Sequence, residues 1–377
     1  IVFELPVAAA TGSAELFAEG AVKLLSSLGI IDTLVFGSEC GDIEALQSIA
    51  RKMLDESDEY RALLKQGLKE GLAFPRARKL ALKEDSGIAD SPNNILGIEY
   101  CKAVMRLETL QASGLPEHGY RIPKLLTLRR VGHDYHDETI PADKSPGADI
   151  SDLDAASLPE HKEPCPVSAA AVRKMMLDGF KGEAEAKDLN LESVTPGSAA
   201  SILEREYGVS LPMEEDDLSD MLAVRLWTLA EEEGDLADIM DMTQGLERKL
   251  LNLPKGPVKF SQLAMELKTK DITYTAICRA LLHVALGTKK SFVGQIKEAA
   301  VFPYARLLGF RSSGSQVLRQ ISDSASLRLI TKLADADRDN GLLAHDIFAA
   351  QCYNQTVYSK FGTKLRGEYE TGPVILQ

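Results

Sequence analysis

Residues 33–42, with the sequence TLVFGSECGD, constrain the fold more than any other stretch. An apolar run from Thr33 to Phe36 ends at Gly37, and a helical pattern begins at Ile43. A β-branched and aromatic run that stops at glycine before a helix is typical of a strand–loop–helix unit. In an open α/β sheet such a loop lies at the carboxyl edge of the strands, where ligands bind. Gly37 would let a ligand approach the backbone closely, although the stretch taken alone is better explained as an ordinary βα turn.

Further elements around this stretch predict a parallel sheet. Ile1–Leu5 is predicted to be a buried strand, Thr11–Leu28 a helix, and Leu125–Val131 another strand. The strand at 1–5, the helix at 11–28 and the strand at 33–36 together predict a β–α–β unit, whose strands are parallel and whose crossover is right-handed. Residues 1–178 are therefore predicted to form a Rossmann-like α/β domain.

The second half of the chain has a different pattern. From Gly179 onward strand signals vanish and helical periodicity dominates, so residues 179–377 are predicted to form a mostly α-helical domain. Trp227, the only tryptophan, occupies an apolar helical position, which favours packing in the core. Pro303–Phe310 is predicted to be a turn or a short helix, and the tail after Tyr353 to be extended.

Charge is distributed unevenly along this acidic chain, whose net charge is −13. Residues 181–244 hold 4 Lys or Arg against 17 Asp or Glu, a net charge of −13, whereas residues 245–320 hold 13 against 4, a net charge of +9. A basic segment of this size is an electrostatic footprint for a polyanion. The alternative is a solvated helical surface whose charges are balanced by the acidic segment folded beside it.

Composition argues against membrane proteins and disulfide-rich secreted proteins. No apolar run reaches the length of a membrane span, and no signal peptide is visible. The five cysteines are scattered and include no CxxC pair, which argues against a disulfide framework and a zinc knuckle. These features fit a protein of the reducing cytoplasm.

Polar side chains stand at the ends of the predicted elements. Asn93 and Asn94 precede a helix at Ile95–Leu110, and one of them can cap it, which leaves the other to bind a ligand. Arg129 and Arg130 stand at the carboxyl end of the third strand, where arginine is costly unless it meets an anion, typically phosphate.

A long polar loop separates this strand from the next helix. Ser168 is the predicted N-cap of that helix, and with Arg173 on the following turn the helix start is also a candidate anion site. The segment Gly132–Asp137 carries two histidines, but no third fixed ligand accompanies them. We therefore predict no metal site.

A series of short motifs follows in a definite order along nearly the whole chain. They are Phe3–Pro6 (FELP), Phe36–Glu39 (FGSE), Phe74–Arg78 (FPRAR), Pro92–Tyr100 (PNNILGIEY), Arg129–Gly132 (RRVG), Tyr135–Asp137 (YHD), Val167–Arg173 (VSAAAVR), Gly245–Glu247 (GLE), Leu267–Lys270 (LKTK), Leu281–His283 (LLH) and Leu307–Phe310 (LLGF). In this joint order the chain resembles the bacterial tRNA(Met) cytidine acetate ligase family.

The resemblance implies an ATP-dependent acetate ligase whose catalytic part is similar to the HxGH nucleotidyltransferases, with a Rossmann-like α/β fold. That family activates acetate as acetyl-adenylate and transfers the acetyl group to the N4 amine of the wobble cytidine in elongator tRNA(Met). The implied cofactors are ATP and the Mg²⁺ that its phosphates carry, so no dedicated protein cage is needed.

The resemblance also implies roles for single residues. The implied ATP contacts are Gly37, Asn94, Arg130, Val131, Ser168 and Arg173. Asn93 is an alternative to Asn94, and Ala169 replaces the second serine of the superfamily's phosphate-facing motif. His136 is a candidate for minor acid–base work, and no other catalytic residue is assigned.

The basic segment 245–320 would then bind tRNA phosphates, while the target base must be splayed out for chemistry. The candidate tRNA contacts are Lys268, Lys270, Arg279, Lys289 and Lys290.

The family opens with a strand and a phosphate-binding HxGH motif, and no HxGH occurs in this chain. We expect that motif in residues that precede Ile1 in the full protein, or else a truncated or separately encoded fragment. A chain without the motif is predicted not to adenylate, because the motif binds the triphosphate. Two other hypotheses therefore stay open: a small-molecule nucleotidyltransferase and a catalytically inactive RNA-binding protein.

Overall fold

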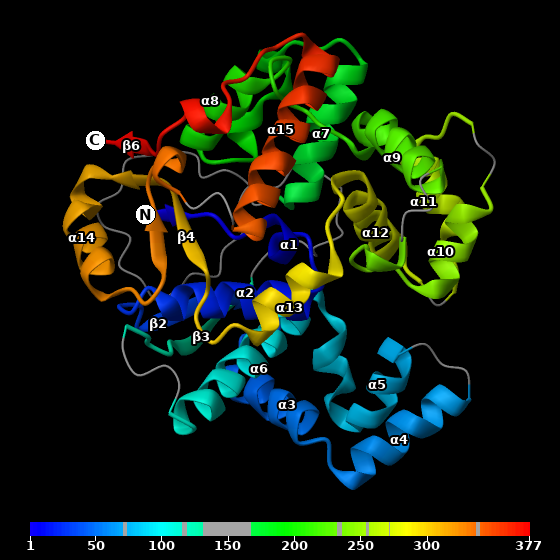
Figure 1. Cartoon of the computed structure of the whole chain (residues 1–377), viewed down its shortest axis with the longest axis vertical. Helices are drawn as coiled ribbons and strands as arrows, with labels where there is room; N and C mark the ends of the chain where they lie inside the picture. The colour runs from blue at the N-terminus through cyan, green and yellow to red at the C-terminus, as the bar shows by residue number, and fades with distance from the viewer. Residues whose placement is uncertain are drawn as a thin grey trace. The chain divides into compact units, whose positions relative to one another are not determined.

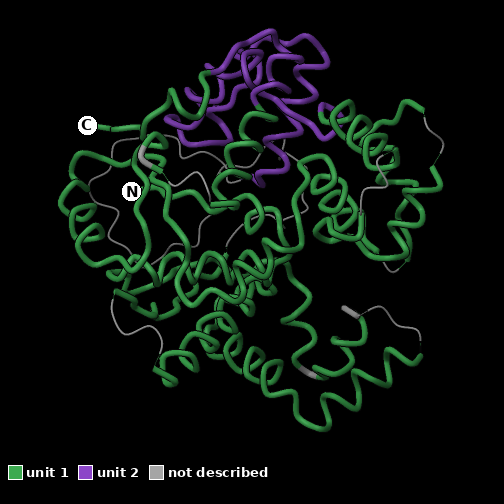
Figure 2. The backbone as a smooth tube through the Cα atoms, in the orientation of Figure 1, with its two compact units in different colours: residues 1–130, 218–353, 366–377 green, residues 131–217, 354–365 purple. Residues whose placement is uncertain are grey.

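The computed structural model describes residues 1–70, 74–114, 119–130, 167–231, 236–253, 256–270, 272–336 and 340–377 (Figure 1). The chain divides into two compact units (Figure 2). The first unit comprises Ile1–Arg130, Leu218–Tyr353 and Arg366–Gln377, and the second comprises Val131–Asp217 and Asn354–Leu365. These units do not follow the boundary at residue 178 that the sequence suggested, because C-terminal strands and helices pack with N-terminal ones.

The strand predicted at 33–36 is β2 (Thr33–Ser38), which pairs in parallel with β3 (Lys124–Arg129). The register aligns Ser38 with Arg129, so the two strands end at the same edge of the sheet. The polar residues predicted at the strand ends therefore start from neighbouring points.

Two helices lie close to this strand pair. α6 (Pro92–Ala112) packs on β2, and a Cβ added to Gly97 would lie 2.7 Å from the Phe36 ring, so this glycine allows the close approach. α3 (Ile43–Asp55) follows β2 and buries Leu46 in a hydrophobic cluster against which Phe36 of β2 also packs. The strand–loop–helix unit predicted from residues 33–42 is confirmed.

The predicted β–α–β unit is wrong in its first strand. β1 (Val2–Phe3) pairs antiparallel with β4 (Tyr304–Arg311) rather than with β2. β5 (Arg328–Ile330) and β6 (Val374–Leu376) both pair in parallel with β4, which gives a four-stranded sheet. An apolar pattern identifies a strand but carries no information about its partner, which in this case comes from the far end of the chain.

The segment Pro303–Phe310 was expected to be a turn or a short helix, but most of it belongs to β4. Tyr304, Ala305 and Leu307 are buried, so the strand lacks the alternation that marks a half-exposed strand. The tail is also shorter than expected, because α15 (Gly341–Phe361) continues past Tyr353.

The remaining α-helices complete the two units. In the first unit they are α1 (Val7–Ala10), α2 (Ala14–Ser27), α4 (Asp58–Lys69), α5 (Phe74–Leu82), α9 (Ser219–Glu231), α10 (Gln244–Leu251), α11 (Phe260–Leu267), α12 (Tyr274–Leu286), α13 (Lys290–Glu298) and α14 (Ser315–Ser324). In the second unit they are α7 (Ala169–Lys181) and α8 (Gly197–Glu206). None of the described helices is both long and apolar enough to cross a membrane.

Helices α9 to α12 group together around a hydrophobic cluster of their own (Figure 1). Leu222 and Leu229 of α9 belong to this cluster, whereas Trp227 lies on another face of the helix. Trp227 is 39% exposed, beside the exposed Val224, so the expectation that it packs in the core is wrong. Helical periodicity alone did not show which of the apolar positions on α9 faces inward.

A buried carboxylate joins the N-terminal segment to the four-stranded sheet. Asp346 of α15 accepts a hydrogen bond of 2.7 Å from the Val7 backbone N–H and another from the Tyr304 hydroxyl. Burial raises the pKa of Asp346 to about 6, although these hydrogen bonds and Arg306 act in the opposite direction. Val7 and Asp346 are 339 positions apart in the sequence, so this contact joins the two ends of the chain.

We expect this carboxyl to make the stability of the fold depend on pH. Its folded pKa lies above its unfolded value, so protonation favours the folded state as the pH falls through about 6. Asp346→Asn removes the titration and keeps an acceptor for Val7. From pH 7.5 to pH 5 the free energy of unfolding of the wild type should rise by about 1–2 kcal/mol relative to the variant, as measured by urea denaturation. Parallel pH profiles for the two proteins would contradict this assignment.

Candidate functional site

The loop after β2 is fixed to β3 by the buried Ser38. Its hydroxyl lies 2.7 Å from the Thr127 hydroxyl and accepts a hydrogen bond of 3.0 Å from the Gly41 N–H. The Arg130 N–H in turn donates to the Ser38 carbonyl oxygen at 2.9 Å. The carboxyl ends of both strands are therefore held in one rigid arrangement.

The same loop exchanges hydrogen bonds with the start of α6. Glu39 Oε1 accepts from the Asn93 N–H at 3.2 Å and from Asn93 Nδ2 at 2.7 Å, and Glu39 Oε2 accepts from the Asn94 N–H at 2.8 Å. Asn94 Oδ1 accepts from the N–H groups of Glu39 and Cys40, at 2.9 and 3.1 Å. The expectation that an asparagine caps α6 is wrong. The Glu39 side chain accepts the hydrogen bonds of the first N–H groups of α6, and the Asn94 side chain accepts those of the loop after β2.

Electrostatics keep the Glu39 carboxylate charged at this helix start. Partial burial alone would raise the pKa of Glu39, but the hydrogen bonds from Asn93 and Asn94 outweigh it, and the pKa lies below its usual value. A carboxylate at a helix N-terminus also interacts favourably with the helix dipole.

Two glycines make room for two arginines at the sheet edge. Gly41 has a φ of +65°, and a Cβ there would lie 2.6 Å from Arg129 Cβ. A Cβ on Gly37 would lie 3.2 Å from Arg130 Cγ, so Arg130 packs over this glycine. Arg130 Nη1 is 3.5 Å from Asn93 Oδ1, at the outer limit of a hydrogen bond. Gly37, Asn93 and Arg130 thus form one surface.

The candidate ATP contacts are not equivalent in this geometry. Gly37 and Arg130 are exposed at the sheet edge, whereas Asn94 is only 3% exposed and its oxygen is committed to the loop. Val131 and His136 lie outside the described residues. The sequence reasoning named Asn94 and did not recognise Glu39 as its counterpart, although Glu39 was visible in the FGSE motif.

Ser168 and Arg173 belong to the second unit. The Ser168 hydroxyl accepts a hydrogen bond of 3.0 Å from the Ala171 N–H, which confirms the predicted N-cap of α7. Arg173 is exposed one turn further along this helix.

The candidate tRNA contacts fall into two classes. Lys268, Lys270 and Lys289 are exposed, and within the described ranges no ion pair holds them. Arg279 Nε donates to Asp241 Oδ2 at 3.1 Å, and Lys290 Nζ donates to the Ala237 carbonyl oxygen. The first three cations are available to a polyanion, whereas the other two already have partners in the fold.

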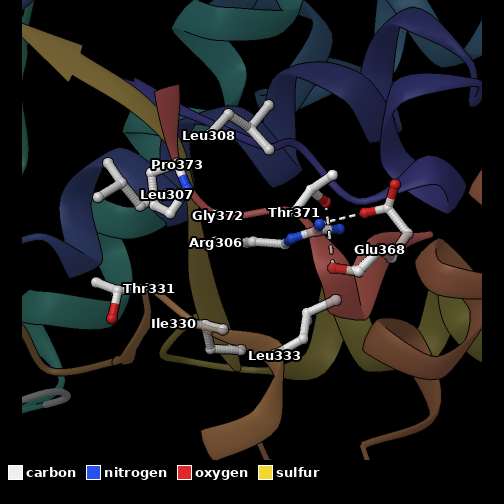
Figure 3. A pocket seen from close by; sticks show the side chains of 10 residues that line it. All are labelled: Arg306, Leu307, Leu308, Ile330, Thr331, Leu333, Glu368, Thr371, Gly372 and Pro373. Atoms are coloured by element: carbon white, nitrogen blue, oxygen red, sulfur yellow. Dashed lines mark hydrogen bonds and ion pairs between the residues drawn. The ribbon is translucent and has the colours of Figure 1, made fainter. Parts of the chain in front are cut away.

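A separate cavity of about 160 Å³ lies beside β4 (Figure 3). Within it, Nη2 of the Arg306 guanidinium pairs with Glu368 (Figure 3). Nη1 of the same guanidinium lies 3.2 Å from Glu4 Oε2. Burial raises the pKa of Glu4 to about 7, against the effect of Arg306. Arg306 is the one cation among the described residues that line the cavity, and it is paired with two carboxylates, so we interpret this cavity as a structural contact of the C-terminal segment. Elsewhere too, no cluster of three or more potential metal ligands occurs among the described residues.

Comparison with known proteins extends these observations to the whole chain. The model of the HIGH Nucleotidyl Transferase family matches residues 1–150 and 156–368. The tRNA(Met) cytidine acetate ligase of Caldicellulosiruptor saccharolyticus is 32% identical over 382 residues, which cover 100% of this chain and 83% of that protein. The protein of the same name from Clostridium perfringens is 29% identical over 390 residues, which cover 100% of this chain and 84% of that protein.

Solved structures share the fold. The apo crystal structure of Thermotoga maritima TmcAL superimposes with a TM-score of 0.78 at 23% identity, over 100% of this chain and 84% of that one. A structure of the same protein bound with alpha-thio ATP gives a TM-score of 0.77 at 24% identity. The predicted α/β, nucleotidyltransferase-like fold is confirmed. The chain belongs to the HIGH nucleotidyl transferase family and, by its similarity to the Caldicellulosiruptor enzyme, to the tRNA(Met) cytidine acetate ligases.

Proposed function

We propose that this chain uses ATP to activate acetate and transfers the acetyl group to N4 of the wobble cytidine in elongator tRNA(Met), in the cytoplasm. The relatives that match it from end to end carry the name of this ligase activity. The observation that carries the proposal is the surface of Gly37, Asn93 and Arg130 at the carboxyl edge of β2 and β3. This is the edge at which open α/β sheets bind nucleotides.

ATP is the proposed first substrate, with Mg²⁺ bound to its phosphates. We propose Gly37 and Arg130 of the first unit as its contacts, and Asn94 as the residue that holds their loop. The resemblance adds Val131, Ser168 and Arg173, which belong to the second unit, as further candidates. An acetate oxygen attacks the α-phosphorus, a P–O bond forms, and pyrophosphate leaves. Negative charge grows on the leaving oxygen, and an arginine near it stabilises the transition state.

The proposed second step transfers the acetyl group. The N4 amine attacks the carbonyl carbon of acetyl-adenylate, AMP leaves, and the nitrogen loses a proton to the surroundings. The mixed anhydride is already activated, so a dedicated general base is not required. His136 remains the proposed candidate for minor acid–base work.

The function is tested by exchange of labelled pyrophosphate into ATP, with the full-length protein. We expect exchange that depends on acetate, because only reversible formation of acetyl-adenylate links the two. Mass spectrometry of tRNA(Met) incubated with acetate and ATP should then detect N4-acetylcytidine. Acetate-independent exchange would favour a plain nucleotidyltransferase, and tRNA binding without any exchange would favour an inactive RNA-binding protein.

Arg130→Ala should weaken ATP binding. Removal of a charge-assisted hydrogen bond to phosphate corresponds to a rise of about 10- to 100-fold in the dissociation constant, measured by calorimetry. Arg121→Ala is the matched control, because Arg121 precedes the opposite end of β3 and pairs with Asp32. Equal ATP affinities for the wild type and Arg130→Ala would remove Arg130 from the proposed site.

Charge reversal at the unpaired lysines should weaken tRNA binding. For Lys268→Glu with Lys270→Glu, we expect a lower affinity and a salt slope reduced by about one unit for each phosphate that is no longer neutralised. The matched control is Lys65→Glu with Lys69→Glu, which reverses two exposed charges on α4, outside the basic segment. Equal reductions in affinity for the two double variants would indicate a general charge effect instead of a binding surface.

A further inference from the structure

The Glu39 carboxylate occupies the start of α6 in the place of an anionic ligand. It accepts three hydrogen bonds there, from two backbone N–H groups and from the Asn93 side chain. Ser91, at the N-cap position, makes no side-chain cap bond. Helix N-termini commonly bind phosphate through these same N–H groups. With Glu39 in place, this helix start is not available to the phosphates of a nucleotide.

The same contact determines which way the Asn93 amide faces. Asn93 Nδ2 donates to Glu39 Oε1 at 2.7 Å, so the amide oxygen is turned away from the carboxylate. That oxygen lies 3.5 Å from Arg130 Nη1. Among the described residues no hydrogen bond or ion pair joins Glu39 to Arg130, and the hydrogen-bonded route from the carboxylate to the guanidinium passes through the Asn93 amide.

Separate hydrogen bonds hold the backbone of the loop that carries Glu39 and the backbone of Arg130. Asn94 Oδ1 binds the N–H groups of Glu39 and Cys40, and the Arg130 N–H donates to the Ser38 carbonyl oxygen. Arg130 also packs over Gly37. The main chain is therefore held at Glu39 and at Arg130, and only the side chains of Asn93 and Arg130 can still change orientation.

We propose that Glu39 is a positioning residue for nucleotide binding: it orients the Asn93 amide, which holds the Arg130 guanidinium over Gly37, ready for the phosphates of ATP. This inference rests on the proposed function. It also assigns the phosphates to the Arg130 side of the loop rather than to the start of α6.

The chemistry requires a carboxylate at position 39. All three groups that face it are donors, and an ionised carboxylate offers acceptors only. In Glu39→Gln an NH₂ group replaces one oxygen. In the place of Oε1 it releases both the N–H and the side-chain amide of Asn93, and in the place of Oε2 it meets the Asn94 N–H and so displaces the side chain that holds the Asn93 amide. The guanidinium then samples more orientations before ATP binds, and this lowers the affinity.

The test compares two variants that remove a helix-capping charge from the same loop. Asp42 caps α3, where its Oδ1 accepts from the N–H groups of Glu44 and Ala45 at 2.9 and 3.0 Å. Asp42→Asn therefore serves as the matched control for Glu39→Gln. The dissociation constant for ATP is measured by calorimetry, and the thermal unfolding midpoint is measured in parallel.

We expect Glu39→Gln to raise the dissociation constant by about three- to tenfold, the range for removal of one hydrogen bond, and Asp42→Asn to leave it unchanged at a similar unfolding midpoint. Equal ATP affinities for Glu39→Gln and the wild type would overturn the inference. So would equal reductions in affinity for the two variants, because the effect would then be one of loop stability alone.

A double-variant cycle tests the route through Asn93. Asn93→Ala removes the amide and leaves both backbone N–H bonds to Glu39, so it should weaken ATP binding even if Glu39→Gln does not fold. Glu39→Gln should add little in the Asn93→Ala or Arg130→Ala background, whereas additive effects would contradict the route. A wild-type protein that does not bind ATP would overturn the proposed function, whereas ATP binding that is indifferent to Glu39 and Asn93 overturns only the inference.

Discussion

The exchange of hydrogen bonds between Glu39 and Asn94 is the contact on which the sheet edge depends. A loop at the end of a strand leaves backbone N–H groups unpaired, and so does the first turn of a helix. Here each element supplies the acceptor for the other: Glu39 binds the N–H groups of α6, and Asn94 binds those of the loop. Neither element needs a ligand to complete its hydrogen bonds, so the edge is organised before a ligand arrives.

This contact separates the buried residues that hold the loop from the exposed residues that we propose as ligand contacts. Asn94 and Ser38 are buried and spend their side-chain oxygens on the loop. Gly37 and Arg130 are exposed beside them. In the proposed ATP site the two kinds of residue have different roles: the first kind maintains geometry, and the second supplies space and charge.

The basic segment shows a similar division. Its net charge of +9 suggests a polyanion partner, but individual cations differ in what already holds them. Arg279 pairs with Asp241 and Lys290 binds a backbone carbonyl, whereas Lys268, Lys270 and Lys289 extend from the surface. Net charge therefore measures the electrostatic field of the segment, and only the local partners decide which side chains can contribute to binding.

The sequence by itself determined the local elements and the family. The β2 strand, its glycine-ended loop and the Ser168 cap follow from rules that act over a few residues, and the order of motifs identified the ligase family that the comparisons confirm. Tertiary structure alone decided the partner of β1, the strand at 304–311 and the exposure of Trp227, because pairing and burial depend on residues that are distant in the sequence. It also decided that Glu39, and not an asparagine, caps α6: the residues in that contact are 54 and 55 positions apart, and no local pattern connects them.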